Sequence, residues 1–111
     1  MLLQNGIENK IIELDYDNTP RNATLVYTSN THVVSHFRYI VGHVFSDQDG
    51  IQYVEFSRDG TNWYGQGECA YTGGDNKGYQ VPVLGNYMRV RFVVGPVNQA
   101  VFDIVVNGAV K

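Results

Sequence analysis

Apolar and polar side chains alternate along most of this chain. The clearest case is residues 88–94, where every second side chain is apolar and two of those between are arginines. Neighbouring residues of an extended strand point to opposite faces of a sheet, so this period of two predicts a strand with one buried face. The same period recurs at 12–16, 25–27, 37–42, 53–57 and 100–106.

Short polar segments with glycine separate these stretches. Asp-Gly pairs at 49–50 and 59–60 are typical of tight hairpin turns, because those turn positions favour positive φ. We expect the glycine-rich segment 72–78 to be a mobile loop, and Pro82 to place the strand 79–83 at a sheet edge. A sustained helical pattern is missing, and we therefore predict an all-β fold. The prediction is an antiparallel β-sandwich of jelly-roll or discoidin-like type with about seven to eight strands.

The length of 111 residues fits one domain. We therefore expect a single β-sandwich domain over residues 1–111, in which residues 1–9 form a flexible N-terminal arm, because chain ends are loose unless tied down. The predicted core comprises the largest apolar side chains of the alternating stretches: Phe37, Tyr39, Val54, Phe56, Val90, Phe92, Phe102 and Ile104.

Composition narrows the classes of partner. The net charge of −3 leaves no basic patch for nucleic acid, and no apolar run reaches the length of a membrane span. Cys69 is the only cysteine, so an intramolecular disulfide is excluded. The first residues do not have the pattern of a signal peptide. We therefore expect no nucleic-acid or membrane partner, and synthesis in a reducing cytoplasm.

Two groups of side chains could bind a metal ion. Three histidines lie close together in the sequence, but on a regular strand one falls on the opposite face from the others: His32, His36 and His43. Four aspartates lie in glycine-containing turns: Asp47, Asp49, Asp59 and Asp75. Calcium takes about six to eight oxygen ligands, which these turns do not supply by themselves. We predict no metal and no other cofactor, and leave calcium binding in the turns as the alternative.

Catalytic chemistry has little support in the sequence. Nothing marks an activating partner for Cys69, and the carboxylate pair Glu13 and Asp15 lies on a presumed solvent face. A phosphate-binding glycine loop would need a helix after Gly73 and Gly74, and the sequence predicts none there. We predict that the protein is not an enzyme and has no catalytic residues.

Aromatic side chains supply the candidate interface or ligand surface. The set lies on strand faces opposite the apolar residues or beside loops, and comprises Tyr53, Trp63, Tyr64, Tyr71, Tyr79 and Tyr87. Tyrosine and tryptophan are enriched at interfaces, because they bury a large area at little entropic cost. The alternative is that the second sheet of the sandwich buries these rings. We expect some of the set to lie at an interface.

Several motifs resemble known β-sandwich families. The Ser-x-Asp-Gly-x-x-Trp hairpin at 57–63 and the Tyr-x-Arg-x-Arg strand at 87–91 resemble discoidin-like (coagulation factor 5/8 C-type) modules. In such a hairpin Trp63 is expected to fold back over the core. Together with Ser-Asp-Gln-x-Gly at 46–50 and Asn-Gln-x-x-Phe at 98–102, the pattern is more similar to small sandwich proteins of prokaryotic viruses.

The resemblance implies a non-catalytic structural protein of a bacteriophage or archaeal virus particle. It would assemble as a homo-oligomer on the capsid, as decoration, or on the tail. Its partners would be copies of itself and other virion proteins, and its location the virion. The alternative is a carbohydrate-binding module that binds a surface glycan, with Trp63, Tyr64 and Tyr71 as a stacking platform.

Overall fold

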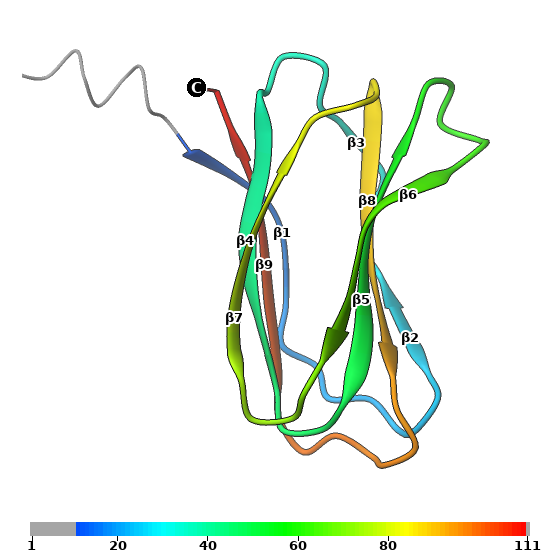
Figure 1. Cartoon of the computed structure of the whole chain (residues 1–111), viewed down its shortest axis with the longest axis vertical. Helices are drawn as coiled ribbons and strands as arrows, with labels where there is room; N and C mark the ends of the chain where they lie inside the picture. The colour runs from blue at the N-terminus through cyan, green and yellow to red at the C-terminus, as the bar shows by residue number, and fades with distance from the viewer. Residues whose placement is uncertain (1–10, 111) are drawn as a thin grey trace, which may run out of the picture.

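The computed structural model describes residues 11–110, and of residues 66 and 67 it describes the backbone only. The described residues form nine β-strands in two antiparallel sheets that pack face to face (Figure 1). This confirms the predicted all-β sandwich, with more strands than the predicted number of about seven to eight. Within these residues no helix is long and apolar enough to cross a membrane. The predicted N-terminal arm, residues 1–9, lies outside the described residues.

Sheet I has the strand order β1-β9-β4-β7. Its strands are β1 (Ile11–Asp17), β9 (Phe102–Ala109), β4 (Tyr39–Ser46) and β7 (Asn76–Pro82). Sheet II has the order β2-β8-β5-β6, with β3 also paired to β8. Its strands are β2 (Val26–Thr28), β8 (Tyr87–Val94), β5 (Gly50–Ser57), β6 (Tyr64–Tyr71) and β3 (His32–Val33). Because β2 and β3 pair with different parts of β8, they act as two halves of one broken strand, and the order is that of a jelly roll.

The core lies between the two sheets and is built around aromatic rings. The alternation in β8 buries Met88, Val90, Phe92 and Val94, as predicted. The ring centroid of Phe92 lies 5.3 Å from that of Phe102 and 5.6 Å from that of Tyr71. Such tilted and edge-on pairs are the arrangements that aromatic rings favour. The predicted core residues are buried with the exception of Tyr39.

The predicted face of β4 is wrong. The alternation placed Phe37, Tyr39 and Val41 inside, but Ile40 and Val44 face the core at 0% and 1% exposure. Phe37 is buried from the turn before the strand, where its N–H bonds the carbonyl of Val34. The period of two therefore begins only at Tyr39, and the side chains of Tyr39 and Val41 point to the outer face of sheet I.

A β-bulge changes the faces of β1. The register with β9 shifts between Glu13 and Asp15, so Asp15 turns inward and Tyr16 is 48% exposed on the outer face. The prediction that Tyr16 shares a face with Ile12 is therefore wrong. The Asp15 carboxylate accepts the N–H of Asn30 at 3.0 Å, and this bond ties β1 to the chain that follows β2.

The edge strand β7 agrees with the prediction from Pro82, because β7 is the outermost strand of sheet I. The loop before it is shorter than predicted, since β7 already begins at Asn76. The N–H of Gly73 donates to Asp49 Oδ1 at 2.8 Å, and the N–H of Gly74 donates to the carbonyl of Ser46 at 2.8 Å. These bonds fix the loop to the turn between β4 and β5.

Candidate functional site

The structure separates the predicted aromatic set into three places. Tyr53, Trp63 and Tyr87 lie on the outer face of sheet II. Tyr71 and Tyr79 lie on the core side of their strands. Tyr64 lies at one end of the sandwich. The three rings that the carbohydrate alternative grouped, Trp63, Tyr64 and Tyr71, therefore do not form a common stacking platform.

An ion network lies at the centre of the outer face of sheet II. In the register between β5 and β8, Glu55 is opposite Arg89 and Tyr53 is opposite Arg91. Arg89 Nε donates to Glu55 Oε1 at 2.7 Å, while Arg91 donates from Nε to Oε1 and from Nη2 to Oε2, both at 3.0 Å. Glu55 is only 8% exposed, so one carboxylate joins two arginines in a mostly buried position.

Both arginines of this network also stack on aromatic rings. The guanidinium carbon of Arg89 lies 4.3 Å from the ring centroid of Trp63, and that of Arg91 lies 4.7 Å from the ring centroid of Tyr53. We refer to the series Trp63, Arg89, Glu55, Arg91 and Tyr53 as the cation–π ladder. The prediction that Trp63 folds over the core is wrong, because its ring packs on Arg89 of the outer face. The ladder holds both rings in fixed orientations.

The charges of the ladder are stable at neutral pH. Burial acts to raise the pKa of Glu55, but the hydrogen bonds and charges of Arg91 and Arg89 outweigh it, and the pKa lies below its ordinary value. The hydrogen bond that Arg91 donates to Glu55 raises the pKa of Arg91 in turn. Two guanidinium groups and one carboxylate therefore give this face a charge network with a net positive charge, flanked by rings.

Apolar side chains surround the ladder on the same face. Val26 is 43% exposed and pairs across the sheet with Val93, which in turn pairs with Ile51. Val33 is 58% exposed and pairs with Tyr87. The outer face of sheet II therefore combines tryptophan, tyrosine and arginine with aliphatic neighbours, the residue types enriched at protein interfaces.

Tyr71 is buried and does not contribute to the candidate surface. Its side chain is 3% exposed, and its hydroxyl accepts the N–H of Ser46 at 2.8 Å and also contacts the carbonyl of Asp75. Burial raises its pKa. Tyr79 packs against the core, and its hydroxyl donates to the carbonyl of Val105 at 3.1 Å. Tyr71 and Tyr79 therefore agree with the alternative interpretation, in which the sandwich buries the rings.

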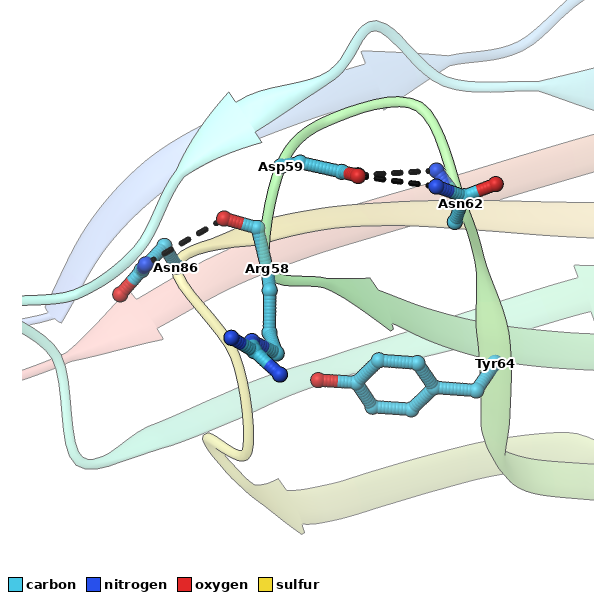
Figure 2. Close-up of a pocket in the computed structure, with 5 residues that line it drawn as sticks. All are labelled: Arg58, Asp59, Asn62, Tyr64 and Asn86. Atoms are coloured by element: carbon cyan, nitrogen blue, oxygen red, sulfur yellow. Dashed lines mark hydrogen bonds between the residues drawn. The ribbon is translucent and has the colours of Figure 1, made fainter.

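Tyr64 lines a cleft at the end of the sandwich where the β5–β6 hairpin meets the loop between β7 and β8. The cleft has a volume of about 510 Å³ and is lined by Arg58, Asp59, Asn62, Tyr64 and Asn86 (Figure 2). Tyr64 is 40% exposed, and its hydroxyl donates to the carbonyl of Leu84 at 3.1 Å. The sequence prediction missed Arg58, Asn62 and Asn86, and only the hairpin motif pointed to this region.

The hairpin turn beside the cleft is tightly bonded. Asp59 Oδ1 accepts the backbone N–H groups of Thr61 and Asn62 at 2.8 and 2.9 Å and the hydroxyl of Ser57 at 2.9 Å. The backbone N–H of Asn62, followed by these other donors, holds the pKa of Asp59 well below its ordinary value. Gly60 has a φ of 82°, a conformation that glycine adopts without strain. The chain does turn at this pair, but the predicted tight turn is wrong in detail, because Asp59 does not have a positive φ, and neither do Asp49 and Gly50.

The histidines lie in three different environments. The ring of His32 bonds the Asp15 carboxylate at 2.9 Å, and the ring of His36 lies 4.0 Å from that of Phe37. His43 is exposed on the outer face of sheet I. Among residues 11–110, no three histidine, cysteine or acidic side chains come together as a metal site would require.

The turn aspartates bond to the backbone. The Asp47 carboxylate accepts the N–H groups of Ala100 and Val101 at 3.0 and 2.9 Å. The bond from Val101 is the main cause of the lowered pKa of Asp47. These bonds connect the β4–β5 turn to the segment before β9.

A family comparison places the chain among known sequences. The family model for the N-terminal domain of the uncharacterised protein YqxG matches residues 4–108. This chain belongs to the YqxG N-terminal domain family. No curated protein matches it.

Two solved structures share the fold of this YqxG-family chain. The PBSX exported protein XepA superposes with a TM-score of 0.81 at 20% identity, over 93% of this chain and 38% of XepA. The chain thus spans well under half of XepA. A structure of Bacillus endospore appendages, described as disulfide-linked pili, superposes with a TM-score of 0.56 at 11% identity, over 93% of this chain and 91% of the other. At these identities the likeness shows the fold.

Proposed function

We propose that this YqxG-family domain is a non-catalytic structural subunit of a bacteriophage or archaeal virus particle. Copies of the chain assemble as a homo-oligomer on the capsid or tail, in contact with other virion proteins. The subunit is made in the host cytoplasm and becomes part of the virion. The observation that carries the proposal is the outer face of sheet II, where Tyr53, Trp63 and Tyr87 gather around the cation–π ladder.

The chemistry of this face suits association between proteins. Tryptophan, tyrosine and arginine are the residue types that dominate binding energy at interfaces. Contacts to Arg89 and Arg91 already fix the rings of Trp63 and Tyr53 in the single chain. Less side-chain freedom is then lost when a partner binds, and this favours association.

The two solved structures with the same fold support the proposal. XepA is described as a PBSX exported protein. The endospore appendages are pili, and pili are built from repeated subunits. A domain with the same fold and an aromatic outer face fits a repeated structural contact, which gains strength through many copies.

Sedimentation velocity over a range of concentrations tests the proposal on the full chain. We expect the wild type to form a defined oligomer, and Tyr53→Ala or Trp63→Ala to weaken association by at least about tenfold. Tyr16→Ala is the matched control, because Tyr16 is an exposed tyrosine on the outer face of sheet I. A wild type that stays monomeric at every concentration would contradict the proposal, as would equal effects of all three substitutions.

We further propose that residues 1–9 form an arm that reaches a neighbouring subunit. Deleting residues 1–9 is expected to leave thermal unfolding unchanged and to weaken association. Unchanged association after the deletion would remove the arm from the assembly.

A further inference from the structure

Arg58 is a cation without an ionic partner in the described part of the chain. Its side chain is exposed, whereas Arg21, Arg89 and Arg91 each bond a carboxylate. Figure 2 shows the Arg58 side chain turned toward the hydroxyl of Tyr64, while the neighbouring Asp59 carboxylate turns to Asn62. The guanidinium is therefore open to an anion that enters the cleft.

The remaining lining of the cleft suits a sugar ring. Tyr64 presents a ring that is 40% exposed, on which an apolar face of a sugar can stack. The side-chain amides of Asn62 and Asn86 supply polar groups for hydroxyls. The volume of about 510 Å³ is sufficient for a monosaccharide unit with its hydration.

The walls of the cleft are tied together before any ligand binds. Tyr64 bonds the carbonyl of Leu84, and Asn86 Nδ2 donates to the carbonyl of Arg58 at 3.4 Å. Gly85 permits this approach, because a Cβ there would lie 2.9 Å from both the carbonyl oxygen of Ser57 and the hydroxyl of Tyr64. The polar groups are thus held in position by the fold.

A second hollow adjoins the cleft. It has a volume of about 440 Å³ and shares Arg58 and Asn86 with the first, while Leu84 and Val83 add apolar surface. Arg58 and Asn86 therefore stand between two neighbouring hollows. This arrangement fits a ligand longer than one ring, such as a segment of a linear glycan.

From these features we infer that the cleft binds a saccharide that carries an acidic group. The guanidinium of Arg58 contacts the carboxylate or phosphate, the ring of Tyr64 stacks on the sugar, and Asn62 and Asn86 bond its hydroxyls. An arginine suits this role because its planar fork matches the oxygens of either anion. None of the residues that line the cleft belongs to the cation–π ladder, and the inference does not depend on the proposed assembly.

Amide-detected NMR titration of the full chain tests this site with three probes. These are methyl β-glucuronide for the carboxylate, glucose 6-phosphate for the phosphate and methyl β-glucoside as the neutral ring. We expect saturable shifts at Arg58, Asn62 and Asn86 with at least one acidic probe, and a Kd for it at least about tenfold lower than for the glucoside. The tighter of the two acidic probes identifies the anion.

Variants then assign the contacts. Arg58→Gln is expected to raise the Kd of the acidic probe by about tenfold and to leave the glucoside unchanged. Arg38→Gln is the matched control, because Arg38 is exposed and does not line the cleft. Tyr64→Phe keeps the stacking ring but removes the bond to the carbonyl of Leu84, so it is expected to weaken the binding of all three probes alike. The inference is overturned by absent binding, by equal affinity for all three probes, or by equal affinities of Arg58→Gln and wild type. Whatever the result of the titration, Arg58→Gln is expected to sediment like the wild type, because Arg58 is not part of the cation–π ladder.

Discussion

Single residues in this sandwich owe their roles to the neighbours that the sheet register brings to them. Glu55 is a clear case, because an isolated glutamate on a strand face is usually solvated. Here Arg89 and Arg91 lie on the adjacent strand and surround its carboxylate, so a charge that is only 8% exposed is fully paired. The pair of arginines could be read from the alternation of β8, but their common partner depends on the pairing of β5 with β8.

Removing the charge of Glu55 is expected to lower stability in a pH-dependent way. Its pKa in the folded chain lies below the ordinary value of 4.5, so the ionised form stabilises the fold above that pH. This stabilisation is lost as the pH falls through 4.5 toward the lower folded pKa. Urea unfolding should therefore show Glu55→Gln about 2 kcal/mol less stable than wild type at neutral pH, with a smaller gap in acid.

Glu68→Gln is the control for this measurement, because Glu68 is an exposed glutamate opposite Tyr53 on the neighbouring strand β6. Its effect on the free energy of unfolding is expected to stay within about 0.5 kcal/mol. A gap between Glu55→Gln and wild type that does not change with pH would show that the carboxylate charge is not what stabilises the ladder.

Among the strands, the alternation of apolar and polar residues predicted the buried face correctly wherever that alternation is uninterrupted. The inner faces of β5, β8 and β9 follow from the sequence, because their period of two is uninterrupted. The faces of β1 and β4 do not follow. A bulge after Glu13 shifts one strand by a residue, and Phe37 is buried from a turn outside the other. Neither the bulge in β1 nor the burial of Phe37 can be recognised from the sequence, since both depend on contacts with β9.

Glycine at position 42 shows how closely β4 packs against its neighbours. A Cβ at Gly42 would lie 2.1 Å from the carbonyl oxygen of Val105 and 2.6 Å from the hydroxyl of Tyr79. Gly42→Ala is therefore expected to cost about 3 kcal/mol in chemical unfolding, since either the backbone or the Tyr79 ring must move. The bond from Tyr79 to Val105 would be lost with it.

The matched control is Gly78→Ala on the adjacent strand β7. A Cβ there would meet only the carbonyl oxygen of Gly42, at an ordinary contact distance of 3.7 Å. Its effect should stay within about 0.5 kcal/mol. Equal effects of the two substitutions would mean that β4 is less tightly packed than the distances indicate.

At the scale of the whole molecule, the candidate site could be predicted only in part. Alternation indicated that Tyr53 and Tyr87 lie opposite the core face, and they do. The position of Trp63 could not be predicted, because its contact with Arg89 joins a hairpin to a strand far along the chain. The cleft at Arg58 was also missed, since its walls come from two segments that only the jelly-roll connections bring together.

In the proposed assembly, the outer face of sheet II contacts other copies of this chain or other particle proteins. Site-specific photo-crosslinking tests it most directly, with a photoreactive phenylalanine analogue placed at Tyr53 in one sample and at Tyr16 in another. We expect intermolecular crosslinks from position 53 at concentrations where the oligomer forms, and few from position 16 on the outer face of sheet I. Crosslinks from position 16 with none from position 53 would contradict it.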